Sequence, residues 1–338
     1  MQKMIRVAVD TMTSEKGVQE GVHGAIRALK EYKDLQVILV GDPAQVKTHL
    51  RGKNYGERLE IFPAMEIIGM DEEPGAAFKA KKDASVTVAA RLVQEGKADA
   101  ACSPGNTGAS LAAATFVLGR IKGVRRPSLM TLMPSSHGST ALLDSGAVVD
   151  CKIEDLVQWG IMGSLYMKEV RGFKEPRVGL LSIGEEEGKG NSFVRDTLPL
   201  MKAAPFNFMG NVEGRDIFNG RCEVVVCDGF VGNVVLKTAE GIAKMIIAGL
   251  KESFLKGNVV EKFGGLLSRS AINRFKGRVS ADELGGAILM GVNGIFVISH
   301  GAASRIMMKN AIRLCYECAK QDITAKLVAQ IAAAGASA

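Results

Sequence analysis

The residues best suited to chemistry lie in short segments rich in glycine and asparagine. Two segments combine a lysine with an amide: Lys189 with Asn191, and Asn233 with Lys237. Ammonium and amide N–H groups stabilise a developing oxyanion, and neighbouring glycines let backbone N–H groups approach a ligand closely. His300 follows an apolar run, where it is able to bind an anion or act as an acid. These five are the candidate catalytic residues.

The same kind of segment recurs at 103–108, 144–147, 183–191, 210–216 and 227–233. Most of these segments open into a helical pattern, and helix N-termini favour anions. A single loop of this kind also fits an ordinary tight turn, but five at successive strand ends predict one shared anion-binding crevice. Candidate phosphate- or substrate-binding residues in them are Gly105, Asn106, Thr107, Gly108, Asp144, Gly184, Gly190, Asn211, Glu213, Arg215, Asp228, Gly229 and Gly232.

Other reaction types are poorly supported. The chain has no G-x-S-x-G motif, and no cysteine stands beside a histidine in sequence. Cys315 and Cys318 form a C-x-x-C in a helical pattern without a second pair, so we expect helix packing there and no metal site. The residues favour chemistry without a protein nucleophile, in which phosphate itself attacks a thioester that the protein positions.

Alternating strands and helices must position these residues. Apolar runs predict strands at 5–9, 36–40, 59–62, 98–102, 128–132, 141–144, 177–183 and 223–227. Helical spacing predicts helices at 21–31, 83–95, 109–118, 153–170, 192–202 and 234–254. This alternation indicates an α/β fold with three layers, α/β/α, around a mostly parallel sheet. We find no linker and no repeat, and predict a single domain over 1–338.

A helical excursion at 236–280 interrupts this pattern and is expected to project. Its apolar residues Val259, Val260, Phe263, Leu266 and Leu267 recur at helical spacing among basic residues, and Glu261 is the only acid in 255–278. Each lysine or arginine near an anionic lipid surface contributes about 1 kcal/mol. We therefore predict contact with an anionic membrane, while packing on a second subunit stays open.

The net charge of +7 and the pI near 9.0 admit several partners. Because the chain has no zinc spacing, RNA-binding aromatic motif or long basic run, we expect no nucleic-acid partner. An acidic protein or an anionic membrane suits a mild, dispersed excess of positive charge. We expect no secretory signal and no bilayer-spanning segment, which points to a cytosolic protein with reduced cysteines.

Several motifs resemble, in order, those of the acyl-carrier-protein:phosphate acyltransferase family (PlsX), from about residue 5 to about residue 313. They are Gly105-Asn106-Thr107-Gly108-Ala109, Leu142-Leu143-Asp144, Ile183-Gly184-Glu185-Glu186-Glu187, Lys189-Gly190-Asn191, the run from Asn207 to Ile217, the run from Cys227 to Val234, and Gly291-Val292-Asn293-Gly294. The resemblance adds Asn293 to the candidate binding residues.

The resemblance implies transfer of a fatty acyl group from acyl carrier protein to inorganic phosphate. The acyl-phosphate product would feed phosphatidic acid and phospholipid synthesis through a membrane glycerol-3-phosphate acyltransferase. It further implies no metal or organic cofactor and a homodimer that is cytoplasmic and peripheral to the membrane. The implied fold is similar to the isocitrate/isopropylmalate dehydrogenase-like and phosphotransacetylase fold.

The chain departs from the family at the first loop, where Asp-Ala-Met-Gly-Gly-Asp-His-Ala-Pro is replaced by the run from Asp10 to Gly17. Val148 stands where the family has asparagine, and Pro104 where it has alanine. We expect an active enzyme, and we expect that restoring Gly-Gly-Asp at positions 13–15 preserves the fold. Alternatives are a CoA-dependent short-chain phosphotransacylase and an inactive paralogue that binds acyl carrier protein at the membrane. A dehydrogenase is disfavoured because no G-x-G-x-x-G follows the first apolar run.

Overall fold

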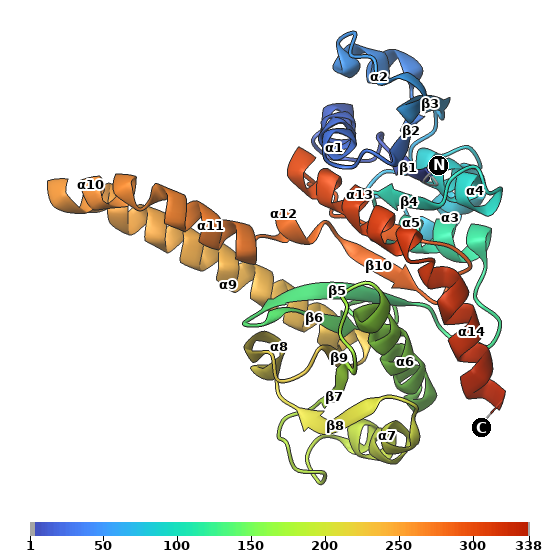
Figure 1. Ribbon diagram of the computed structural model, residues 1–338, viewed down its shortest axis with the longest axis vertical. Coiled ribbons are helices and arrows are strands. Elements are labelled where there is room, and N and C mark those ends of the chain that lie inside the picture. Colours follow the sequence, from blue (N-terminus) through green and yellow to red (C-terminus); the bar gives the residue numbers. More distant parts are fainter. Residues whose placement is uncertain (1–3, 337–338) are drawn as a thin grey trace.

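The computed structural model describes residues 4–336, in which eleven strands form one sheet with helices on both faces (Figure 1). The strands are β1 Ile5–Asp10, β2 Leu35–Gly41, β3 Leu59–Pro63, β4 Ala100–Ser103, β5 Ser128–Ser135, β6 Gly138–Leu143, β7 Arg177–Leu181, β8 Asn207–Val212, β9 Val224–Val226, β10 Ala287–Met290 and β11 Phe296–Ile298. Their order in the sheet is β3-β2-β1-β4-β11-β10-β5-β6-β9-β7-β8.

The helices fall between these strands. They are α1 Val18–Glu31, α2 Pro43–Leu50, α3 Pro74–Ala80, α4 Ser85–Gln94, α5 Thr107–Ala113, α6 Ile153–Glu169, α7 Ser192–Ala203, α8 Asp216–Asn219, α9 Gly229–Lys256, α10 Val259–Leu267, α11 Arg269–Val279, α12 Ala281–Leu284, α13 Arg305–Lys320 and α14 Ile323–Ala336. A 3-10 turn, Gly56–Arg58, precedes β3, and a π-helical turn, Ala114–Leu118, continues α5.

Two hydrophobic layers sandwich the sheet. On one face α1, α6, α13 and α14 bury residues such as Leu29, Trp159 and Met308 against the strands. On the other face α3, α4 and α5 cover the half that contains β1 and β4, while α8 and the start of α9 cover β6 and β9. Burial on both faces explains the nearly continuous apolar runs of β1, β2 and β9. The predicted three-layer α/β/α class is confirmed.

Strand direction divides the sheet into two halves. The strands β3, β2, β1, β4 and β11 run parallel to one another, and so do β6, β9, β7 and β8. Between the halves, β10 pairs antiparallel with β11 and β5, and β5 pairs antiparallel with β6. Three successive reversals leave the two halves pointing in opposite directions, so their carboxyl ends lie at opposite edges of the sheet.

The prediction missed β8, which the sequence presented as a loop. Its exposure alternates, and it lies at the end of the sheet beside β7 alone, so it lacks the continuous apolar run of a central strand. Gly210 interrupts it with φ of 94°, next to a shift in the register with β7. An edge strand with a bulge carries a weak sequence signal.

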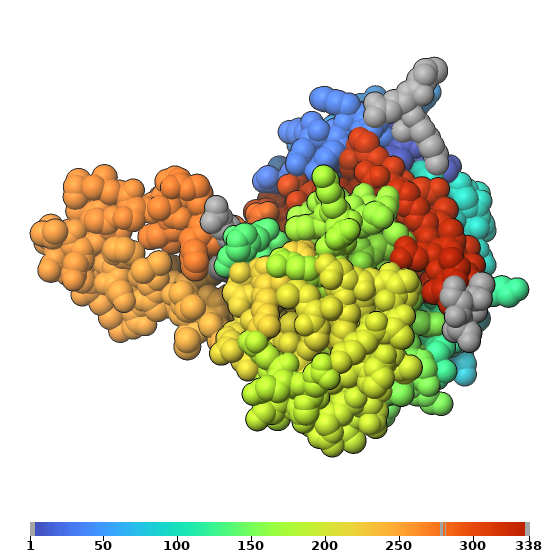
Figure 2. All heavy atoms as spheres, turned by 60° about the horizontal axis from the view of Figure 1, so that its bottom comes forward, coloured from blue at the N-terminus to red at the C-terminus, as the bar shows by residue number. Residues whose placement is uncertain are grey.

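Helices α9–α11 extend away from this body as an arm (Figures 1 and 2). The first turns of α9 are anchored, because Val235, Leu236 and Ala239 pack against the core under β6 and β9. Beyond them, most of the large apolar side chains of α9 and α10 are exposed. The side chain of Arg278, in the predicted basic stretch, lies outside the described part. Within residues 4–336, no helix is long and apolar enough to cross a membrane.

Candidate active site

Four of the five predicted loops lie along one edge of the sheet. They follow β6, β9, β7 and β8, whose carboxyl ends are neighbours in the sheet order. The 103–108 loop follows β4 and therefore lies at the opposite edge. The expectation of one crevice shared by all five loops is thus wrong within a single chain, because the antiparallel strands between the halves reverse the direction of β4 relative to β9.

The 183–191 loop brings Lys189 and Asn191 to the beginning of α7. The Asn191 side chain caps this helix by accepting a hydrogen bond from Val194 N at 2.9 Å. Gly190, with φ of 97°, makes the turn before the cap. Lys189 is exposed, and its side chain lies over Gly184. The cap satisfies one N–H of the first turn of α7, and the remaining N–H groups beside the exposed ammonium of Lys189 are suited to binding an anion.

The 227–233 loop builds the start of α9, which is next along the same edge. Asp228 caps the helix by accepting from Val231 N at 2.9 Å. Gly232 packs so closely on the preceding loop that a Cβ there would lie 1.8 Å from the carbonyl oxygen of Asp144. Asn233 follows on the exposed side, beside Gly146. One turn later, Lys237 is exposed and forms an ion pair with Glu240 at 3.2 Å.

Asp144 is buried and holds the 144–148 segment against the 227–233 loop. Its buried carboxylate accepts hydrogen bonds from the backbone N–H groups of Leu129, Gly146, Ala147 and Val148, at 2.6 to 3.3 Å. Burial raises the pKa of this carboxyl, and the four donors oppose that rise. Val148 O in turn accepts from Gly229 N at 3.0 Å. The carboxylate therefore positions the first turn of α9.

Charged side chains from β8 and its loop complete this edge. Asn211 is buried and donates its amide to Glu186 O at 2.9 Å, which ties β8 to the 183–191 loop. Arg215 pairs with Glu213 at 3.1 Å and with Glu185 at 3.4 Å. Arg221, which was not among the predicted site residues, also contacts Glu185. Hydrogen bonding from that guanidinium lowers the pKa of Glu185.

The opposite edge contains a buried carboxylate that the sequence reasoning missed. Asp10, at the end of β1, accepts from Thr13 Oγ1 and Ser103 Oγ, both at 2.7 Å, and from Met12 N at 3.0 Å. Its burial is complete and raises the carboxyl pKa despite these three donors. The available signal was an aspartate that ends an apolar run directly before an unusual loop.

The 103–108 loop is packed into this second cluster. Gly105 abuts the Thr13 side chain, and Gly108 abuts Pro74. Asn106 caps α5 through Ala109 N at 3.1 Å, and its amide points to the carbonyl oxygens of Gly69, Met70 and Glu72 at 3.1 to 3.4 Å. Thr107 is exposed as the first residue of α5. The amide of Asn106 is therefore committed to closing a loop.

His300 and Asn293 lie apart from each other. His300 is exposed after β11, at the edge that contains Asp10, and its Nδ1 accepts from Ala302 N at 3.1 Å. Asn293 lies in the turn between β10 and β11, at the edge of the four loops, and donates to Arg120 O at 2.9 Å. Of the five candidate catalytic residues, the structure thus places Lys189, Asn191, Asn233 and Lys237 on one edge and His300 on the other.

Comparisons with known proteins agree with this architecture. The family described as fatty acid synthesis protein matches residues 5–326. A phosphate acyltransferase from Halothermothrix orenii is 44% identical over 330 residues, which cover 97% of this chain and 98% of the relative. The phosphate acyltransferase from Pelotomaculum thermopropionicum is 46% identical over 313 residues, with 93% and 91% covered.

Solved structures with a similar fold are distant in sequence. A phosphotransacetylase from Streptococcus pyogenes matches with a TM-score of 0.62 at 15% identity, covering 95% of both chains. A protein from Salmonella typhimurium assigned as a 4-hydroxythreonine-4-phosphate dehydrogenase matches with a TM-score of 0.53 at 13% identity, covering 93% of this chain and 99% of its own. These likenesses establish the fold alone.

Proposed function

Because the chain belongs to the fatty acid synthesis protein family, with relatives that are phosphate acyltransferases, we propose that it transfers a fatty acyl group from acyl carrier protein to inorganic phosphate. It is an acyltransferase. The observation that carries the proposal is the match at about 45% identity over nearly the whole length of these relatives. The acyl-carrier-protein donor rests on the resemblance of the loop motifs, and the product would supply phosphatidic acid synthesis.

The proposed reaction requires no nucleophile from the protein. A phosphate oxygen attacks the thioester carbonyl, the C–S bond breaks, and the thiol leaves with the proton that phosphate gives up. Lys189, Asn191, Asn233 and Lys237 are proposed to hold phosphate and the oxyanion at the starts of α7 and α9. These loops leave from β7 and β9, which are adjacent strands. Positioning and preorganised N–H donors are then the main sources of rate.

The arm suggests how the enzyme assembles and where it works. Along α9, Val234, Ile242, Met245 and Ile246 are exposed, which suits packing on a second copy of the chain. At the tip, Val259 is 83% and Val260 78% exposed, beside Lys256 and Lys262. We propose a cytoplasmic homodimer that touches an anionic membrane through its tips. An apolar, labile acyl-phosphate would then be released near a membrane acyltransferase that consumes it.

One assay tests the proposed reaction. Purified protein is incubated with palmitoyl-acyl carrier protein and phosphate, and acyl-phosphate is trapped with hydroxylamine as the hydroxamate. We expect phosphate-dependent product, with lower kcat/KM for CoA thioesters than for the carrier-bound donor. A preference for short-chain CoA thioesters would favour the phosphotransacylase alternative. If none of the thioesters yields acyl-phosphate, the protein is the inactive paralogue.

A further inference from the structure

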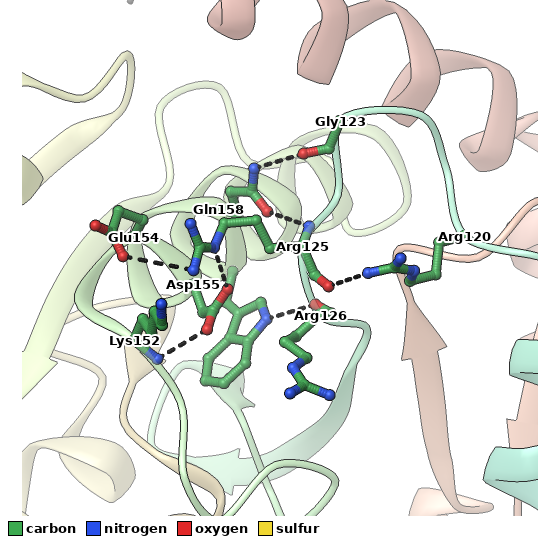
Figure 3. Close-up of polar contacts among 9 residues, drawn as sticks. Arg120, Gly123, Arg125, Arg126, Lys152, Glu154, Asp155 and Gln158 are labelled. Carbon is green, nitrogen blue, oxygen red and sulfur yellow. Dashed lines mark hydrogen bonds and ion pairs between the residues drawn. The ribbon is translucent and has the colours of Figure 1, made fainter.

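The loop of residues 119–127, between the π-helical turn and β5, presents a group of positive charges. Arg120, Lys122, Arg125 and Arg126 are all exposed, and so is Lys152 from the segment before α6. Figure 3 shows Arg120, Arg125, Arg126 and Lys152 of this group. We call these five residues the basic loop cluster. None of them is needed for the proposed phosphate site, so their presence calls for another explanation.

Helix α6 fixes the backbone of this loop from one side. Gln158 accepts from Arg125 N at 3.0 Å and donates to Gly123 O at 2.9 Å. The buried Trp159 donates its indole N–H to Arg126 O at 3.0 Å. Figure 3 shows the Gln158 side chain reaching from the helix to the loop. Both side chains bind main-chain atoms, so they hold the loop in shape without occupying its cations.

The turn between β10 and β11 fixes the other side. Asn293 Nδ2 donates to Arg120 O at 2.9 Å, and Asn293 N donates to Gly119 O at 2.9 Å. Ile121 N donates to Gly291 O at 3.0 Å. A loop held on both sides presents its side chains from a rigid base, which reduces the ordering cost when a partner binds.

Most of the cluster's charge is free for a partner. Arg125 pairs with Asp155 at 3.1 Å and approaches Glu154 at 3.9 Å. By contrast, the side chains of Lys122, Arg126 and Lys152 form no ion pair with any residue of the described range 4–336. Asp150 is the other exposed acid in the neighbouring segment. The arrangement leaves a net positive surface that is not neutralised internally.

The cluster lies beside the four-loop edge. It directly precedes β5, in which Leu129 N donates to Asp144 at 2.8 Å. From Asp144 the contacts continue through Val148 O to Gly229 N at the start of α9. Lys152 follows the same 144–150 segment. A protein bound to the cluster would therefore have its surface next to the loops proposed to hold phosphate.

We infer that the basic loop cluster docks an acidic surface of the carrier protein that delivers the acyl thioester. The inference rests on the proposed function, which makes the donor a protein. Exposed cations on a preorganised loop suit an extended acidic surface, and such complementarity affects encounter and orientation more than chemistry. The cluster sets the KM for a carrier-bound donor and leaves the reaction of the thioester itself unchanged.

The test is the double charge reversal Lys122→Glu/Arg126→Glu, compared with Lys47→Glu/Lys53→Glu. The control changes the charge equally at exposed lysines on α2 and the loop after it. We expect the first variant to raise KM for acyl-carrier protein by about tenfold or more, with kcat nearly unchanged. Turnover of a protein-free acyl-pantetheine thioester should equal wild type. Fluorescence titration with holo-carrier protein should show the same weakening without turnover, and the control should match wild type in every measurement.

Each contrary outcome has a distinct meaning. Unchanged carrier affinity and KM in the Lys122/Arg126 variant would overturn the docking surface, and so would an equal loss with acyl-pantetheine. If the variant loses binding to anionic vesicles but keeps carrier affinity, the cluster is a membrane contact and the inference is wrong. If wild-type protein binds the carrier through the cluster but forms no acyl-phosphate, the proposed reaction fails while the docking surface stands.

Discussion

At the scale of single residues, amide and carboxylate side chains at the two sheet edges hold loops and helix starts in place. Asn106, Asn191 and Asp228 each cap a helix, and Asp144 binds four backbone N–H groups. A capping side chain satisfies one N–H of the first turn, and the other N–H groups of that turn point outward. Lys189, in contrast, is exposed beside a capped helix start. We therefore assign a structural role to the capping oxygens of Asn106, Asn191 and Asp228, which leaves the amide of Asn191 for the ligand, and we place the ligand-binding charge on Lys189.

Replacing Lys189 by alanine should weaken phosphate use and leave folding intact. The ammonium group is exposed and its removal opens no cavity, so the melting temperature should stay within about 2 °C of wild type. KM for phosphate should rise about tenfold or more, because a charge-assisted hydrogen bond contributes about 1.5–3 kcal/mol. The matched control is Lys202→Ala, whose ammonium pairs with Glu187 of the same loop. Equal phosphate kinetics in both variants would remove Lys189 from the site.

Asp10 should make stability depend on pH. Its pKa in the folded protein is raised above the ordinary 3.8, so the folded state holds the proton more tightly than the unfolded state. The resulting stabilisation is complete below pH 3.8 and is lost as pH rises through the higher folded-state pKa. Asp10→Asn cannot ionise and should lack this loss. The free energy of unfolding of wild type should therefore fall relative to the variant as pH increases from 4, measured by urea titration. Parallel pH profiles for the two proteins would contradict this assignment.

At the scale of elements, the first loop is adapted to its neighbours in this chain. Thr13 donates to Asp10, lies 3.3 Å from Ser103 Oγ and packs against Gly105. Positions 13–15 do not require glycine, because none of them has a left-handed φ. In the described part of the chain, the non-glycine residues with a left-handed φ are Arg51 and Asp322. The expectation that Gly-Gly-Asp at positions 13–15 preserves the fold did not take into account the buried hydroxyl of Thr13.

We now expect the triple change Thr13→Gly/Ser14→Gly/Glu15→Asp to reduce the free energy of unfolding by about 2–5 kcal/mol. The lost hydrogen bond to a buried carboxylate accounts for about 1–3 kcal/mol, and each added glycine for about 0.5–1 kcal/mol. Urea unfolding measures the loss, and Ser14→Gly alone should cost about 1 kcal/mol or less. A triple variant as stable as wild type would show that the Thr13 hydroxyl contributes little.

At the scale of the whole molecule, the arm separates two apolar surfaces. The stem residues Ile242 and Met245 lie along the long helix α9, whereas Val260 and Leu267 lie at the tip on α10. A second copy of the chain suits the elongated stem, since it can present the same stripe in return. A membrane suits the tip, where exposed apolar residues lie beside Lys256 and Lys262. The two contacts can therefore be disrupted independently.

Glutamate substitutions should distinguish these contacts. Val260→Glu and Leu267→Glu should abolish sedimentation with anionic vesicles, keep the dimer, and leave turnover in solution nearly intact. Ile242→Glu/Met245→Glu should yield monomers in analytical ultracentrifugation. If the tip variants sediment with vesicles like wild type, the tip is not the membrane contact. If they become monomeric, the tip packs on the second subunit instead.

The sequence by itself determined the local features of this protein. Apolar runs and helical spacing placed most strands and helices, because a strand buried on both faces and an amphipathic helix each leave a pattern in neighbouring residues. Motif order indicated the family, since Lys189-Gly190-Asn191 and the runs at 207–217 and 227–234 are contiguous in the chain. The helical excursion predicted at 236–280 rested on the same kind of local signal, because its apolar residues recur at helical spacing.

Only the tertiary structure decided which loops lie together. The 103–108 loop and His300 were expected beside Lys189, but strand direction depends on hydrogen bonding between β11, β10, β5 and β6, which are far apart in sequence. The same holds for Asp10, whose partner Ser103 is 93 residues away, and for the 119–127 loop, which is held by α6 and Asn293. Nonlocal pairing leaves no periodic trace along the chain, so these arrangements required the folded coordinates.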